Sequence, residues 1–493
     1  MPLLGLAALA GCAAPMQFPA RPVSEAQTPE GIVRAYSVDA KGRADFFTTQ
    51  GADGRIFRIA YDTSGGGKPD AVVDLDEIHT PDCRHLVIVL DGMPYGVVEA
   101  YRQKGGLRLF YPPSRLVSTY PAMTDLALTD AFGAVRCYAP ESIHFDHRAN
   151  RLVGGEADYL SMKNERWADF CDYRAFPIND NIAYVFPEPF LRYELGNILD
   201  RLHKRDRSVL VFYLISTAGQ ATKEGEAGMI KVLEGVDRLS EQLVYETHGL
   251  IKITVFSDHG HTMKRCERLD PRPLLAAKGW HIADRLDGPR DVVPIEFGLV
   301  TFTSFATKDR AGLAADLVQC KGFRFAYYED GPAVAVRSAD GQAVVERRGG
   351  RYRYRATQGD PLQLLPVFEK LKRQGKLDAD GFAADQPLFE ATATHVYPDA
   401  CNRLWRAFHG LIEDPPDVMA DLDWGFYAGA ASRAALYGAA ASTHGDLERT
   451  SSTAVFLSTI GPLAPALRHR DLTKAMQELT GRPWPEPRQG RAE

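Results

Sequence analysis

The chain has 493 residues, which exceeds the usual size of one domain, so we expect two or more structural units. Its composition, 45% hydrophobic and 25% charged, is typical of globular proteins and excludes a disordered or fibrous chain. The 58 basic and 64 acidic residues give a net charge of −6, without the strongly basic domain of a nucleic-acid-binding protein. Apolar runs of about 20 residues, which a membrane helix needs, are also missing. We therefore expect a large soluble protein, either an enzyme or a binding protein.

The N-terminus carries a short apolar stretch, Met1 to Gly11, followed by Cys12. Such a stretch is typical of an export signal. Leu9-Ala10-Gly11-Cys12 resembles the lipobox of bacterial lipoproteins, in which the cysteine is lipidated after cleavage. No Lys or Arg precedes the apolar run, so an apolar N-terminus with an unmodified cysteine is the alternative. The lipobox predicts an exported protein of the bacterial cell envelope, anchored at Cys12 on the periplasmic side of a membrane or at the cell surface.

Six further cysteines could form three disulfides in an exported chain, with 15 possible pairings. Buried thiols are the alternative, and the wide spacing of the cysteines argues against a thiolate metal site. The six are Cys83, Cys137, Cys171, Cys266, Cys320 and Cys401.

Four apolar, β-branched runs predict strands that are buried on both faces, as in a mostly parallel sheet covered by helices. They are residues 86–90, 208–215, 250–256 and 453–459. A helix is predicted between the second and third runs, with Gly249 at its end. Its apolar face comprises Met229, Leu233, Val236, Leu239, Leu243 and Val244. Strand, helix and strand at this spacing predict a right-handed crossover and a three-layer α/β/α core.

Two flanking regions show alternation of apolar and polar residues, which favours antiparallel strands. The first is an N-terminal β-meander, and the second, residues 325–357, contains turns at Asp340-Gly341 and Gly349-Gly350. The second region predicts a small β-rich cap inserted into the core. The expected division is a signal peptide over 1–11, a tether over 12–30, the meander over 31–80, the core over 81–310 and 395–470, the cap over 311–394 and a tail over 471–493.

Candidate ligands follow the predicted strands. Asp91-Gly92 follows the first, and Ser257-Asp258-His259-Gly260 follows the third, while Thr443-His444-Gly445 precedes the last. Because ligands of open α/β sheets bind beyond the carboxyl ends of strands, we expect these side chains to meet. Carboxylates combined with imidazoles indicate a zinc-type hydrolytic site.

These motifs, VLDG, Pro121-Ala122-Met123-Thr124, SDHG and the late THG, resemble the alkaline phosphatase superfamily, and within it the type I phosphodiesterase/nucleotide pyrophosphatase branch. The resemblance covers about residues 84–305 and 395–465. It implies an alkaline phosphatase-like fold in which Thr124 attacks phosphorus and, with Asp91, Asp258 and His259, binds a divalent metal, most simply Zn²⁺. Thr119, directly before Tyr120-Pro121, is the rival nucleophile.

The resemblance also shows where the chain departs from the family. The second metal site should read Asp-x-x-x-His, but Ser216 and Gln220 stand there, and only the third ligand, His444, remains. This set brings no negative charge, so we expect one tightly bound metal and a degenerate second site. A basic side chain could replace the second ion. Lys223 is the first candidate, Lys264 and Arg265 are others, and His261 could also reach the cleft.

The main functional hypothesis is a metal-dependent hydrolase of phosphate mono- or diesters that forms a covalent phospho-threonine. The alternatives are a catalytically degenerate binding or scaffold protein of the envelope, a transferase that passes a phosphoryl-type group to a lipid or glycan, and a sulfatase-like single-metal enzyme. The expected partners are a small-molecule, lipid or glycan ester and the membrane, without nucleic acid.

Overall fold

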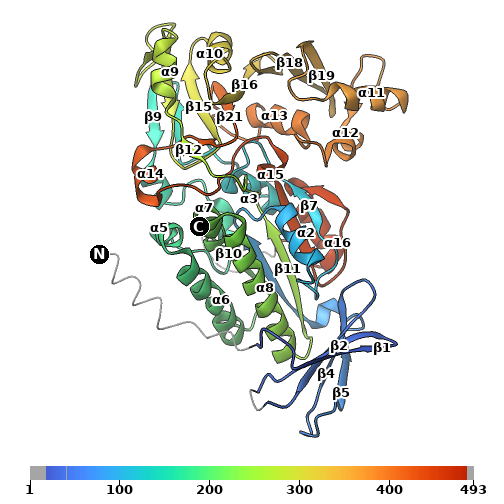
Figure 1. The fold of residues 1–493 in the computed structure, drawn as a ribbon. Helices are drawn as coiled ribbons and strands as arrows, with labels where there is room; N and C mark the ends of the chain where they lie inside the picture. Colours follow the sequence, from blue (N-terminus) through green and yellow to red (C-terminus); the bar gives the residue numbers. More distant parts are fainter. Residues whose placement is uncertain (1–17, 40–41, 486–493) are drawn as a thin grey trace.

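The computed structural model describes residues 18–39 and 42–485 (Figure 1). The predicted signal peptide and Cys12 lie outside the described residues. In the part that is described, no helix combines the length and the apolar character that a membrane crossing needs.

An antiparallel five-stranded sheet forms the N-terminal unit, in the sequential order expected of a meander. Its strands are β1 (Ser24–Thr28), β2 (Gly31–Tyr36), β3 (Phe46–Gln50), β4 (Ile56–Tyr61) and β5 (Ala71–Asp74). The tether prediction was wrong for β1, which pairs along its whole length with β2. Because β1 is an edge strand with mostly exposed, polar residues, it lacks the apolar alternation that would have revealed it. Phe18 is also packed, with its ring 5.2 Å from that of Tyr36.

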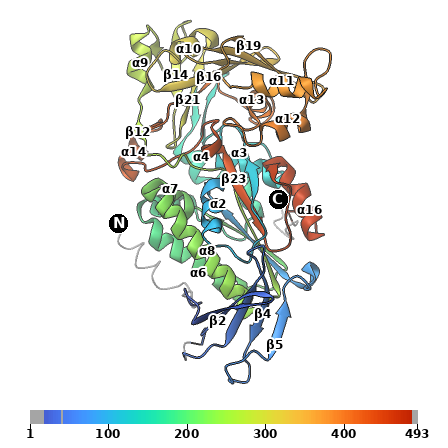
Figure 2. The same cartoon turned by 45° about the vertical axis from the view of Figure 1, so that its right-hand side comes forward.

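The core is built on a six-stranded sheet in the order β10-β6-β11-β23-β7-β24. All strands run in one direction except β23, which is antiparallel to both of its neighbours. Figure 2 shows α6 and α8 on one side of this sheet and α3 and α16 on the other, which makes a three-layer α/β/α core. The strands are β6 (Arg84–Leu90), β7 (Ser114–Val117), β10 (Val209–Leu214), β11 (Ile251–Ser257), β23 (Thr453–Ser458) and β24 (Ala466–Arg468), and the helices are α2 (Tyr95–Gln103), α3 (Thr124–Phe132), α6 (Pro187–Lys204), α8 (Glu226–Glu246) and α16 (Leu472–Thr480).

Helix α8 is the helix predicted between the second and third apolar runs. All six residues of its predicted apolar face are at most 4% exposed. Gly249 follows the helix with a φ of 80°, a conformation that glycine adopts without strain. The crossover passes over one strand, because β10 and β11 lie on opposite sides of β6.

A nine-stranded sheet forms a second body beyond the carboxyl ends of the core strands (Figure 1). Its order is β13 (His281–Ile282), β14 (Asp291–Ile295), β15 (Phe302–Thr307), β21 (Val418–Leu422), β16 (Phe323–Asp330), β17 (Ala333–Arg337), β18 (Gln342–Arg348), β19 (Arg351–Gln358) and β20 (Ala383–Ala384). The predicted turns at Asp340-Gly341 and Gly349-Gly350 join β17 to β18 and β18 to β19. The sheet takes in strands on both sides of 311–394, because β14, β15 and β21 complete it.

The remaining elements pack on the core helices, connect the two bodies or cover the second sheet. They are β8 (Ile143–Asp146), β9 (Arg151–Gly154), β12 (Glu267–Arg268), β22 (Phe426–Tyr427), α4 (Glu156–Leu160), α5 (Pro177–Val185), α7 (Ser216–Glu224), α9 (Pro271–Ala277), α10 (Arg310–Leu317), α11 (Leu365–Arg373), α12 (Asp385–Thr392), α13 (Ala400–Phe408), α14 (Ala431–Tyr437) and α15 (Arg449–Ser452), with short 3₁₀ turns at Thr80–Asp82, Arg166–Phe170 and His469–Asp471.

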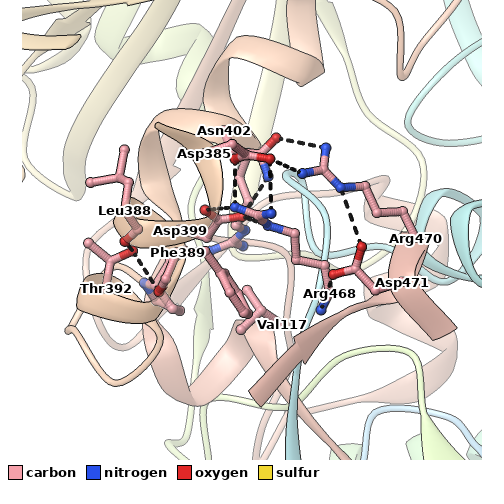
Figure 3. Close-up of polar contacts among 12 residues, drawn as sticks. Val117, Asp385, Leu388, Phe389, Thr392, Asp399, Asn402, Arg468, Arg470 and Asp471 are labelled. Atoms are coloured by element: carbon pink, nitrogen blue, oxygen red, sulfur yellow. Dashed lines mark hydrogen bonds and ion pairs between the residues drawn. The ribbon is translucent and has the colours of Figure 1, made fainter. Parts of the chain in front are cut away.

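A buried ion cluster ties the two bodies together (Figure 3). Arg468, on the core strand β24, donates to both carboxylate oxygens of Asp399 at 2.6 and 2.8 Å. It also donates to both oxygens of Asp385, the first residue of α12, at 3.1 and 2.8 Å. Asp399 directly precedes α13, so one guanidinium joins the edge of the core sheet to two helices of the second body.

Of the two alternatives for the cysteines, the structure supports buried thiols at five positions. Cys83, Cys137, Cys266, Cys320 and Cys401 are free thiols, and all of them are buried. Cysteine is among the residue types that are most often buried as small hydrophobic groups, which explains these positions.

Candidate metal and nucleophile site

The structure brings Asp91, Asp258 and His259 together at one edge of the core sheet. Asp91 directly follows β6, and Asp258 and His259 directly follow its parallel neighbour β11, with Ser257 paired to Leu90. The His259 Nε2 atom lies 3.6 Å from Asp91 Oδ1 and 3.4 Å from Asp258 Oδ2. All three side chains are buried, so register and parallel pairing produce the cluster that the strand ends predicted.

Hydrogen bonds orient each of the three side chains and leave one atom of each for a ligand. Tyr213 donates to Asp91 Oδ2 at 2.5 Å, and the Gly92 N–H donates to Asp258 Oδ1 at 2.9 Å. His259 Nδ1 donates to the Gly260 carbonyl at 2.9 Å, so its Nε2 carries the lone pair. The other oxygens, Asp91 Oδ1 and Asp258 Oδ2, are buried without a hydrogen-bond partner. Two unpartnered carboxylate oxygens and an imidazole lone pair fit a divalent cation.

The electrostatics of the cluster favour a cation as well. Burial, followed by the charge of Asp258, raises the pKa of Asp91 above its ordinary value, and burial also raises the pKa of Asp258. Burial lowers the pKa of His259 to about 3, so the ring is neutral near pH 7. The two buried carboxyls therefore resist carrying negative charge together, and a divalent cation beside them would stabilise their ionised forms.

Thr124 lies beside this cluster at the start of a helix. It is the first residue of α3, and its hydroxyl oxygen lies 3.2 Å from His259 Nε2. The rival Thr119 is buried and donates its hydroxyl to the Pro121 carbonyl at 2.9 Å. Of the two, Thr124 alone lines the cavity described next.

A cavity of about 160 Å³ opens over Asp91, Thr124 and His444. Part of its wall is the loop between β14 and β15, which contributes residues 297–300. The wall combines aromatic rings with carboxyl groups, so a substrate group of moderate size would contact both. The rings are those of Tyr159, Trp167, Tyr184, Tyr213, Tyr437 and, from the loop, Phe297, and the further carboxyl groups are those of Asp125, Glu141, Glu165 and Asp180.

The basic residues predicted as substitutes for a second ion do not line this cavity. Lys223, Lys264 and Arg265 are exposed, and the Lys264 ammonium lies 3.6 Å from the centre of the Trp424 ring. Lys223 lies in the last turn of α7 and is exposed, whereas residues 216–222 of the same helix are buried, so its ammonium does not lie among the reacting groups.

Two arginines line the cavity instead, and sequence reasoning missed both. Arg174 forms ion pairs with the carboxylates of Glu165 and Asp180. Arg433 lies over the rings of Phe297 and Tyr159, at 4.1 and 4.8 Å from their centres.

The ion-pair partner of Arg433, Glu156, has a side chain that is 66% exposed. Arg433 is therefore the cavity cation whose charge is less fully compensated. Neither arginine belongs to a motif, and no local pattern distinguishes Arg433 from a surface arginine.

The degenerate second site is buried and neutral. Ser216 and Gln220 lie on α7 and have no exposed surface. Both amide atoms of Gln220 are without a hydrogen-bond partner. His444 donates from Nδ1 to the Ala122 carbonyl at 2.9 Å, and its ring stacks on that of His259, with 3.8 Å between centres and 14° between planes.

No protein-family model and no curated protein matches the chain. Among solved structures, the chain is similar to murine ectonucleotide pyrophosphatase/phosphodiesterase 5, with 12% identity and a TM-score of 0.42 over 83% of this chain and 97% of that chain. It is also similar to phosphonoacetate hydrolase from Sinorhizobium meliloti, solved in complex with phosphonoformate, with 13% identity and a TM-score of 0.45 over 81% and 95% of the two chains. Similarity at this level assigns neither an activity nor a substrate, so the function of the chain has to be argued from its own site.

Proposed function

We propose that the chain is a metal-dependent hydrolase of phosphate mono- or diesters in which Thr124 is the nucleophile. The observation that carries this proposal is the position of the Thr124 hydroxyl, 3.2 Å from the His259 nitrogen around which Asp91 and Asp258 converge. These three residues and Thr124 would hold one divalent cation, and the mixed oxygen and nitrogen donors suit Zn²⁺.

A bound cation would supply a lowered pKa to the Thr124 hydroxyl, which is otherwise a poor nucleophile. The Thr124 oxygen attacks phosphorus, forming an O–P bond while the bond to the ester oxygen breaks, and the leaving group departs as an alcohol that carries the proton given up by the Thr124 hydroxyl. Backbone N–H groups at the start of α3 favour the phosphate oxygens. Water then attacks the phospho-threonine, which releases phosphate or a monoester and restores the hydroxyl. Arg433 is placed to bind a second anionic group of the substrate in the cavity.

The neutral second site favours one competing function. Without charged ligands at Ser216 and Gln220, the chain could serve as a catalytically silent binding protein of the envelope. We favour the hydrolase because the Thr124 hydroxyl lies 3.2 Å from His259 Nε2, beside the buried, unpartnered oxygens of Asp91 and Asp258, and a protein that only binds does not require a hydroxyl there. From the lipobox alone, we also propose that the protein is exported and anchored through Cys12.

Paired substitutions separate the chemistry from metal binding. Thr124→Val removes the hydroxyl but keeps the shape, so turnover of p-nitrophenyl phosphate esters should fall at least about 10³-fold. Metal content, measured by elemental analysis, should stay nearly unchanged, because three stronger ligands remain. Asp258→Ala removes a charged ligand and should lose both metal and activity.

Thr119→Ala is the matched control and should keep most of the activity, since its hydroxyl is already engaged by a carbonyl. If Thr119→Ala is inactive while Thr124→Val is active, the nucleophile is Thr119. A wild-type protein that binds the metal but hydrolyses no phosphate mono- or diester with Zn²⁺, Mn²⁺ or Mg²⁺ would instead support the binding protein.

A further inference from the structure

Three imidazoles, those of His259, His261 and His444, meet beside the proposed catalytic cation. All three are buried, and one ring nitrogen from each lies within 4.8 Å of the corresponding atoms of the other two. His444 and His259 both donate from Nδ1 to backbone carbonyls, which can only accept. Their Nε2 atoms therefore carry lone pairs that can bind a metal.

His261 presents an unpartnered nitrogen to the same place. Its Nδ1 lies 3.2 Å from the Ser442 hydroxyl, whereas its Nε2 is buried without any hydrogen-bond partner. A side chain on residue 92 would remove this arrangement, since a Cβ there would lie 2.6 Å from His261 Nε2. Because residue 92 is a glycine, the edge of the His261 ring can approach the backbone directly after Asp91. A buried polar atom without a partner costs free energy, which indicates a ligand.

The ring orientations assign the three histidines to two ions. The lone pairs of an imidazole lie in the ring plane, and the His259 and His444 rings are stacked almost parallel at 3.8 Å. Their lone pairs therefore run side by side and suit two neighbouring ions better than one. His259 belongs with Asp91 and Asp258, which leaves His444 for another ion. The His261 ring is inclined at 50° to that of His444, with centres 5.1 Å apart, so these two lone pairs can converge.

We propose that His261 and His444 hold a second divalent cation beside the first, in place of the missing ligands at Ser216 and Gln220. This site rests on the first cation of the proposed hydrolase, because that cation occupies His259. Two neutral imidazoles favour a borderline ion such as Zn²⁺ or Co²⁺ over Mg²⁺ or Ca²⁺. Without a carboxylate, this second ion is bound more weakly than the first and exchanges on dialysis.

Titration of the full-length, metal-free protein with Co²⁺ or Zn²⁺ tests the site, with calorimetry and equilibrium dialysis counting the bound ions. The wild type should bind one equivalent tightly and a second more weakly. His261→Gln, which keeps a polar side chain of similar size, should weaken the second equivalent at least about 10-fold and leave the tight one unchanged. Mg²⁺ should not replace the second equivalent.

Two control variants make the result specific. His85→Gln removes a buried imidazole at the other end of β6, where Nε2 is hydrogen-bonded to the Thr254 hydroxyl at 2.8 Å, and should still bind two equivalents. Gln220→Leu should also bind two, because the amide is not a ligand in this proposal. Should His261→Gln misfold, Ser442→Ala, which removes the partner of Nδ1, should weaken the same equivalent.

The outcomes separate this inference from the proposed function. A wild type that binds only one ion, even in millimolar Zn²⁺, refutes the second site and leaves the hydrolase intact. Two equivalents in His261→Gln refute the role of His261. If the wild type binds no ion tightly, there is no catalytic cation, and the proposed function is refuted with it.

Discussion

The ion cluster around Arg468 gives a prediction of stability. The Arg468 side chain is 6% exposed and that of Asp399 is 2% exposed, so this pair is shielded from water (Figure 3). Burial opposes the charge of Arg468, but the charges of Asp399 and Asp385 and their hydrogen bonds raise its pKa above the ordinary value. Arg468→Met keeps the apolar stem and removes the charge.

The expected magnitude follows from what remains after that substitution. Asp385 keeps an ion pair with Arg470 at 2.7 Å. Asp399 keeps a hydrogen bond from Asn402 at 2.6 Å and the attraction of the nearby buried Arg403, but loses its ion pair. Removing one partner of a buried pair typically costs about 3–5 kcal/mol, because the other charge is left uncompensated. We expect a loss in this range, and Asp399→Asn in the Arg468→Met background should restore most of it.

The loss of unfolding free energy can be measured by urea denaturation, monitored by circular dichroism and by tryptophan fluorescence, in the transition in which the second body unfolds. Lys474→Met is the control, since Lys474 forms an exposed pair with Glu478 on α16, and a change below about 0.5 kcal/mol is expected there. A loss below about 1 kcal/mol for Arg468→Met, or no recovery in the double variant, would refute the reasoning.

Three further predictions concern the cavity, pH and the N-terminus. Arg433→Met should raise KM about 10-fold or more for phosphate esters that carry a second anionic group, and it should change kcat little. p-Nitrophenyl phosphate esters without a second anionic group should be unaffected. An equal effect on both kinds of ester would contradict a binding role for Arg433. Burial raises the pKa of Glu141 from 4.5 to about 7, so its contribution to stability is complete below pH 4.5 and is lost as the pH rises through 7. Glu141→Gln should flatten the dependence of the unfolding free energy on pH over this window, and an unchanged slope would contradict that origin. Cys12→Ser should release the full-length protein from membrane fractions, whereas equal partitioning of both forms would argue against lipidation.

The cluster of proposed cation ligands could be predicted because its residues follow strands with a clear sequence pattern. The runs before Asp91 and Asp258 are continuously apolar, and parallel neighbours end at the same edge, so adjacency in space follows from the pattern. The direction of a strand is not encoded in this way. The run 453–459 looks like the others, yet β23 is antiparallel, and His444 reaches the site because it precedes that strand.

The cavity wall could not be predicted, because its residues come from distant loops that carry no periodic signal. Phe297 lies between β14 and β15, and Arg433 lies on the short helix α14. They meet only when the nine-stranded sheet docks on the core, which is a property of the whole fold. The choice between disulfides and buried thiols could not be made from the sequence for a related reason, since the compartment argument counts thiols but does not weigh how well each one packs.

The position of β23 makes the C-terminal part of the chain an internal component. Residues 453–458 form a strand in the middle of the core sheet, between β11 and β7, although they are synthesised last among these three. Until they arrive, both neighbours present open edges, and such edges promote association between chains. A chain that stops before residue 453 therefore has a gap at the centre of its sheet and not a trimmed end. We expect truncation there to be as damaging to folding as deletion of β6, although the residues removed include none of the proposed cation ligands.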